Sequence, residues 1–184
     1  MRLSELFVQA GGPRGLLQCI NGDKEIVDAI CDHPTIKAVS FVGSSDIAQY
    51  VYSRATANGK RAQCMGGAKN HGIIMPDANM DQAVKDILGA AYGSAGERCM
   101  ALPVVVPVGE GTAERFLEKM LPAIESMRVG ISEDKEADYG PVVTLEHRES
   151  IKSQVTKAVE EGAKLLVDGR DFSLQGYENG FFIG

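Results

Sequence analysis

The chain has 184 residues, of which 44% are hydrophobic and 24% charged, and its formal net charge is −6. This length and composition predict one or two globular domains with a substantial core. Acidic and basic residues are interspersed without a dense basic patch, which argues against a nucleic-acid partner. No apolar run reaches the roughly 18 residues that a membrane-spanning helix needs, and the first residues lack the apolar core of a secretion signal.

The predicted elements alternate between helix and strand. Helices are predicted over residues 2–10, 24–32, 46–58, 79–92, 112–127 and 145–161. Strands are predicted over residues 16–20, 38–42, 62–65, 72–75, 104–106 and 164–167. Strands that alternate with helices are typical of βαβ units, so we expect an α/β fold with a mainly parallel sheet.

Local signals set several of these boundaries. Pro34 stops the helix over residues 24–32. Asn79 and Gln82 have the spacing of a capping box. The chain has no Pro/Gly/Ser-rich linker, so a domain boundary must be tight, and we place it near the turn predicted at Gly66 and Gly67.

Four cysteines and three scattered histidines give no spacing typical of a metal site, and none is predicted. The absence of paired cysteines favours a reduced, intracellular protein. Cys19, Cys31 and Cys64 lie within predicted strands or helices and are interpreted as packed side chains.

Cys99 has a different setting. It follows a run of small residues, Gly93 to Gly96, which lets a substrate approach the backbone, and it adjoins Arg98. A nucleophilic thiol must be reachable and must lie among groups that favour the thiolate. From the residues alone, a buried and unreactive cysteine remains the competing interpretation.

A second candidate site is the junction Gly43–Ser44–Ser45, where a predicted strand leads into a helix. Free N–H groups at such a helix start suit a phosphate, although serine is also an ordinary helix cap. The chain has no G-x-G-x-x-G fingerprint.

The third candidate is the connection between two predicted strands, from Gly66 to His71. Its paired glycines suit a close approach of the backbone to a ligand. A tight connection between strands explains them equally well.

Together, the order and spacing of these stretches resemble the aldehyde dehydrogenase superfamily. The stretches that carry the resemblance are Ala38–Ser44, Gly66–His71, Pro76–Asn79 and Gly96–Ala101. Their forms Gly-Ala-Lys-Asn-His and Gly-Glu-Arg-Cys-Met-Ala resemble its CoA-acylating methylmalonate-semialdehyde dehydrogenase branch. The resemblance covers essentially the whole chain. It implies that residues 1–66 are part of a Rossmann-like NAD-binding domain and residues 67–184 are part of the α/β catalytic domain.

The resemblance also implies roles for single residues. Cys99 would attack an aldehyde, and the adduct would pass a hydride to NAD and become a thioester. Ser44, with Gly43 beside it, matches a contact to the cofactor's pyrophosphate or ribose. Gly66 matches another cofactor-lining position.

One departure indicates the acyl acceptor. Hydrolytic members of the family show a run similar to Leu-Glu-Leu-Gly-Gly. Its Glu activates the water that cleaves the thioester. The matching run in this chain is Gln63–Gly67, in which Cys64 stands in place of that Glu. A neutral thiol is a poor base. We therefore expect coenzyme A as co-substrate, with methylmalonate semialdehyde giving propionyl-CoA and malonate semialdehyde giving acetyl-CoA. The resemblance implies a place in valine, pyrimidine or inositol breakdown.

Family members are considerably longer, and motifs expected before and after this stretch are absent, so we expect an incomplete fragment with little activity of its own. The chain also ends directly after an apolar segment. The resemblance implies homotetramers for full-length members, in the bacterial cytoplasm or the mitochondrial matrix. Two alternatives remain open: a hydrolytic NAD-dependent aldehyde dehydrogenase, and a non-catalytic fragment that binds a partner subunit or a nucleotide.

Overall fold

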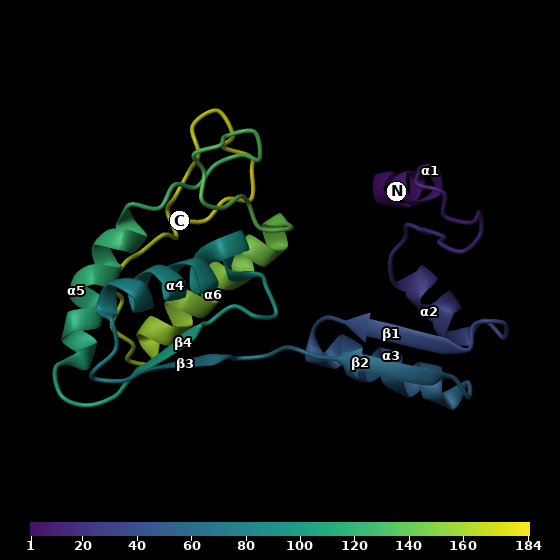
Figure 1. Ribbon diagram of the computed structural model, residues 1–184, viewed down its shortest axis with the longest axis horizontal. Coiled ribbons are helices and arrows are strands. Elements are labelled where there is room, and N and C mark those ends of the chain that lie inside the picture. The colour runs from purple at the N-terminus through teal and green to yellow at the C-terminus, as the bar shows by residue number, and fades with distance from the viewer. The chain divides into compact units, whose positions relative to one another are not determined.

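The computed structural model describes residues 1–184, which form two compact units, Met1–Gly67 and Ala68–Gly184. The predicted α/β class is confirmed, since helices alternate with strands that pair in parallel (Figure 1). The elements are α1 (Arg2–Gln9), α2 (Lys24–Asp32), β1 (Ala38–Val42), α3 (Ser45–Ala57), β2 (Arg61–Met65), β3 (His71–Ile74), α4 (Met80–Tyr92), the 3₁₀ turn η1 (Gly93–Gly96), β4 (Val104–Pro107), α5 (Thr112–Glu125) and α6 (Leu145–Glu160). No helix is long and apolar enough to cross a membrane.

The first unit is built on a βαβ motif. β1 and β2 pair in parallel, with Ala38 opposite Arg61 and Val42 opposite Met65, and α3 connects them. Alternate strand residues are partly buried because one face of the pair packs against helices while the other stays open. The core of this unit consists of Cys31, Val51 and Ala55, with Val27, Val39, Phe41, Tyr50, Ala62 and Cys64 packed around them.

A polar network joins α2 to α3. Nη2 of Arg54 lies 2.6 Å from a carboxylate oxygen of Asp32, and its Nη1 lies 3.4 Å from Asp28. The Tyr50 hydroxyl donates to Asp28 at 2.6 Å. The hydrogen bond from Lys24 lowers the pKa of Asp28, and the one from Arg54 lowers the pKa of Asp32. Charge pairing therefore fixes the two helices at the edge of the apolar core.

The predicted strand over residues 16–20 is wrong, because this segment forms turns and extended backbone without a strand partner. A strand requires a neighbour for its N–H and C=O groups, and the two strands of this unit pair with each other. The apolar side chains of Leu16 and Ile20 are 72% and 66% exposed as a result. The helix α1, which precedes this segment, buries no residue.

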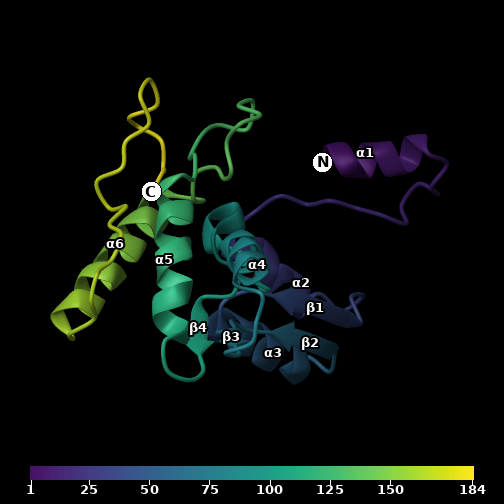
Figure 2. The same cartoon turned by 60° about the vertical axis from the view of Figure 1, so that its left-hand side comes forward.

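The second unit contains the parallel pair β3–β4, with His71 opposite Val104 and Ile74 opposite Pro107. α4 lies between the two strands in sequence and packs against α5, and both helices contribute to the core (Figure 2). The buried residues of this core are Ile74, Met80, Val84, Ile87, Phe116 and Met120. The long helix α6 buries no residue completely.

Two local predictions in this unit need correction. Residues 164–167 form no strand, and Leu165 and Leu166 are 38% and 44% exposed. The capping box at α4 is only half formed. Asn79 accepts a hydrogen bond from the Gln82 N–H at 3.2 Å, but the Gln82 side chain donates to Asp86 instead of reaching back to Asn79.

Candidate functional site

The junction Gly43–Ser44–Ser45 lies at the carboxyl end of β1, where α3 begins. Ser44 is the N-cap residue, and its side chain accepts no capping hydrogen bond, so the hydroxyl stays exposed and free. The first intrahelical bond runs from Ala48 N–H to the Ser44 carbonyl, which leaves the preceding N–H groups of the helix without a protein acceptor. Free N–H groups and a hydroxyl at a helix start fit a phosphate group. Asp46 adds an acidic side chain to the same turn.

Gly66 and Gly67 lie beside this helix start rather than in a turn. The Gly67 N–H donates to the Ser45 hydroxyl at 3.1 Å. A Cβ atom at Gly66 would lie 2.7 Å from the Ser45 Oγ. The Gly43 N–H in turn donates to the Met65 carbonyl at 3.1 Å. The structure thus brings together the three residues predicted to contact the cofactor, and packing against Ser45 by itself accounts for the glycine at position 66.

The Cys64 thiol faces the core of the first unit, where it packs with Val39 and Phe41. Because side chains alternate along a strand, Met65 projects from the opposite face and is 52% exposed. Gln63 also lies on the exposed face. The run Gln63–Gly67 therefore has no carboxylate on either face of the strand. It offers no carboxylate that could serve as a general base for water.

Cys99 is exposed, on a tight turn between η1 and β4. The Ala101 N–H donates to the Arg98 carbonyl at 3.0 Å and closes the turn, which places Cys99 at its second position. The Cys99 N–H has no protein acceptor. The predicted nucleophile is thus reachable, with a free backbone donor beside it.

The predicted break before Cys99 has an unusual backbone. Ser94 and Ala95 have φ angles of 54° and 53°, in the left-handed region that non-glycine residues rarely adopt. Each such residue costs about 1–2 kcal/mol. The break ends α4 sharply and turns the chain toward Cys99.

Arg98, the residue before Cys99, makes its side-chain hydrogen bond to α4. Its guanidinium donates to the Gly89 carbonyl near the end of α4, where the carbonyl groups of the helix favour a cation. A Cβ at Gly93 would collide with this guanidinium, so the glycine makes room for it. Arg98 therefore fastens the Cys99 segment to α4.

Two further side chains contact the Cys99 segment, and the sequence did not predict either contact. The Asn70 side-chain amide donates to the Cys99 carbonyl at 2.9 Å and to the Ala101 carbonyl at 2.8 Å. Nδ1 of His147, in the first turn of α6, lies 3.2 Å from a carboxylate oxygen of Glu97. Both contacts join residues far apart in sequence, which is why periodicity and spacing did not reveal them.

The other cysteines differ in setting. Cys31 is fully buried, and burial raises the pKa of its thiol. Cys19 is exposed in the segment that fails to form a strand, so its expected packing is wrong. The structure contains no group of three or more His, Cys, Asp or Glu side chains placed to hold a metal ion.

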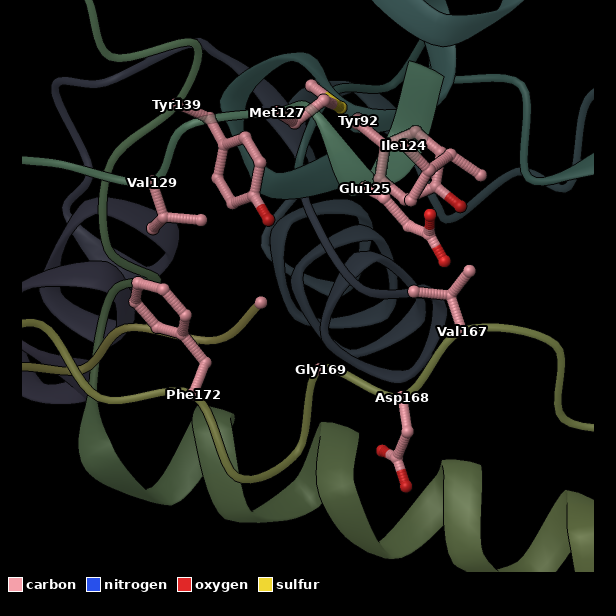
Figure 3. Close-up of a pocket in the computed structure, with 11 residues that line it drawn as sticks. Tyr92, Ile124, Glu125, Met127, Val129, Tyr139, Val167, Asp168, Gly169 and Phe172 are labelled. Atoms are coloured by element: carbon pink, nitrogen blue, oxygen red, sulfur yellow. The ribbon is translucent and has the colours of Figure 1, made fainter. Parts of the chain in front are cut away.

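A cavity of about 370 Å³ lies in the second unit, lined by parts of α4, α5 and the segments that follow (Figure 3). The rings of Tyr139 and Phe172 border it, and burial raises the pKa of Tyr139 and Tyr92. None of the residues predicted to bind or react lines this cavity. No cysteine lines it, and it is separate from the Cys99 turn.

Curated relatives that match this chain over 99–100% of its length are semialdehyde dehydrogenases. A malonate-semialdehyde dehydrogenase from Pseudomonas aeruginosa is 47% identical over 99% of this chain and 37% of its own length. A mitochondrial acylating methylmalonate-semialdehyde/malonate-semialdehyde dehydrogenase from Rattus norvegicus is 44% identical over 100% of this chain and 34% of its own. The chain thus spans roughly a third of the curated relatives it matches.

A solved structure agrees with the sequence relatives. It is assigned as a methylmalonate-semialdehyde dehydrogenase from Sinorhizobium meliloti and was determined in complex with NAD. It is 62% identical to this chain with a TM-score of 0.95, over 100% of this chain and 37% of its own. The model of the aldehyde dehydrogenase family matches residues 1–184. With a match over its full length, the chain belongs to the aldehyde dehydrogenase family.

Proposed function

We propose that this chain carries the nucleophile and part of the cofactor site of an NAD-dependent, CoA-acylating methylmalonate-semialdehyde dehydrogenase. The observation that supports this most strongly is the exposed Cys99 on a closed turn with a free N–H beside the thiol. An exposed thiol on a braced turn can attack a carbonyl, and the free N–H can donate to the oxygen that becomes negative.

The reaction balances as follows. The Cys99 sulfur bonds to the aldehyde carbon, the hydrogen of that carbon leaves as a hydride, and a thioester remains on Cys99. NAD supplies the hydride acceptor when bound, and the free N–H groups at Ser44 and the start of α3 would hold its pyrophosphate. CoA then takes the acyl group through its own sulfur. The methylmalonyl group loses carbon dioxide, and a proton takes its place on the carbon. In the overall balance the CoA thiol supplies that proton, and Cys99 returns as the thiolate.

The choice of CoA over water rests on the last residues of β2. Neither Cys64, which faces the core, nor the exposed Met65 can serve as a carboxylate base for water. A thioester without such a base persists until a better nucleophile arrives, and a thiolate is one. Malonate semialdehyde would give acetyl-CoA by the same steps.

The test is NADH release from methylmalonate semialdehyde, with and without CoA, for the unaltered chain and for Cys99→Ala and Cys19→Ala. We expect a low rate, because the chain spans 37% of the Pseudomonas aeruginosa relative and 34% of the Rattus norvegicus one. That rate should require both CoA and Cys99. Cys19→Ala, which changes another exposed thiol, should leave the rate unchanged. Full NADH release without CoA would identify water as the acceptor, and release by Cys99→Ala would exclude Cys99 as nucleophile.

A further inference from the structure

The turn that carries Cys99 is held at its ends by backbone hydrogen bonds. The Ala101 N–H closes it onto the Arg98 carbonyl, and the Leu102 N–H donates to the Ala90 carbonyl of α4 at 3.3 Å. Neither bond involves the backbone of Cys99 itself. Something else must fix the direction in which the Cys99 Cα–Cβ bond points.

Asn70 supplies the missing contact. Its Nδ2 atom donates to the Cys99 carbonyl at 2.9 Å and to the Ala101 carbonyl at 2.8 Å, and the side chain is partly buried. This is the one hydrogen bond that the Cys99 backbone makes with another protein group. A single amide therefore holds the peptide group of Cys99 and that of the residue that closes its turn.

The strand register explains why a side chain is needed there. His71 pairs with Val104, so a continued parallel ladder would bring Asn70 opposite Pro103. Proline has no N–H, so the ladder cannot continue along β4. The Asn70 side chain has two N–H donors and serves two carbonyls beyond this interruption. An ionised aspartate would offer no donor, and a serine would offer one.

We propose that Asn70 is a positioning residue for the Cys99 nucleophile, which it orients through the Cys99 backbone. The side chain touches neither the thiol nor a substrate in this arrangement, so its effect comes from the direction of the Cys99 Cβ and of the free Cys99 N–H. Misplacement of a reacting group by about 1 Å can cost a factor of about 100 in rate. This proposal rests on the proposed function, because an oriented thiol matters only if Cys99 attacks a carbonyl.

The test uses acyl exchange, in which the Cys99 sulfur attacks the thioester carbon of propionyl-CoA. The new C–S bond forms as the bond to CoA breaks, and the departing CoA thiolate takes the proton of Cys99. Peptide mass spectrometry measures propionyl on Cys99 and on the exposed Cys19. Alkylation by iodoacetamide is measured alongside, because a small reagent needs an accessible thiol but not an oriented turn.

Asn70→Ala should slow acyl exchange at Cys99 by about 10-fold or more and alkylation by no more than about twofold. It should also speed hydrogen exchange of the amides from Cys99 to Leu102. Asn70→Asp, which keeps the shape and loses both donors, should match it. Asn70→Ser keeps one donor and should be intermediate, and it serves as the folded variant if Asn70→Ala does not fold.

Asn79→Ala is the matched control. It removes an exposed asparagine that caps α4 in the same unit at 3.2 Å, and it should lower thermal stability without slowing acyl exchange at Cys99. Unchanged exchange in Asn70→Ala, or equal slowing by Asn79→Ala, would overturn the positioning role while leaving the nucleophile intact. If the unaltered chain acylates Cys19 as readily as Cys99, the proposed function fails and the role of Asn70 falls with it.

Discussion

A Cβ atom on Gly66 would lie 2.7 Å from the Oγ of Ser45 and 3.0 Å from its Cα, so the strand connection packs directly on the start of α3. Ser45 also accepts the Gly67 N–H at 3.1 Å, which fixes the same approach from the next residue. The two candidate cofactor segments of the first unit therefore form one packed feature. Their geometry depends on the Ser45 side chain, which the sequence marked only as part of a possible phosphate site.

Gly66→Ala should destabilise the first unit by about 1–3 kcal/mol, because the added methyl group overpacks the contact with Ser45. Urea unfolding, followed by hydrogen exchange in peptides from α3 and β2, measures this loss. Ser45→Gly in the same chain should recover part of it, since only the 3.0 Å contact with the backbone Cα remains. If Gly66→Ala is as stable as the unaltered chain, the packing described here is incorrect.

The first unit should lose stability in acid because of the α2–α3 network. The pKa of Asp32 is lowered in the folded state by the hydrogen bond from Arg54. The Asp32 carboxylate contributes fully to the free energy of unfolding above the ordinary aspartate pKa of about 3.9. This contribution is lost as the pH falls through the lower pKa that Asp32 has in the folded state. Hydrogen exchange of α2 and α3 between about pH 5 and pH 2 should therefore report progressive loosening.

Arg54→Met should flatten this acid dependence, since Asp32 then titrates near its ordinary value in both states. The matched control is Lys119→Met, which breaks an exposed 2.7 Å pair with Asp81 in the other unit. It should leave the acid profile of the first unit unchanged. An acid profile that Arg54→Met does not alter would show that other groups govern the loss.

Thr112 offers a change that should stabilise the second unit. The residue is fully buried at the start of α5, and its Oγ1 has no hydrogen-bond partner. Thr112→Val removes this hydroxyl at nearly constant shape and should raise the free energy of unfolding by about 1 kcal/mol. Chemical denaturation measured by circular dichroism gives the value.

Thr144→Val is the control of opposite sign for that substitution. The Thr144 hydroxyl accepts the His147 N–H at 3.1 Å and caps α6. Its loss should cost about 1 kcal/mol. Equal effects of the two valine substitutions would mean that the Thr112 hydroxyl has a partner after all.

The elements that were predicted correctly have local causes. The sequence places α2 at its observed bounds because Asp23 and Pro34 flank an amphipathic stretch. The strand β1 is predicted from the alternation of its side chains.

The strands predicted over residues 16–20 and 164–167 do not form, because a strand depends on a partner elsewhere in the chain. Cys99 was predicted as the nucleophile from its motif, and the structure leaves its thiol exposed. The role proposed for Asn70 was not predicted, because it depends on the register of β3 against β4 and on the missing N–H of Pro103.

We expect an acyl group on Cys99 to pass to CoA rather than to water. The most direct test loads Cys99 with propionyl from propionyl-CoA, removes the excess, and follows the thioester by peptide mass spectrometry in buffer alone and in buffer with CoA. We expect a long-lived thioester in buffer and rapid loss when CoA is added, with propionyl-CoA regenerated. Hydrolysis in buffer as fast as the loss with CoA would contradict it.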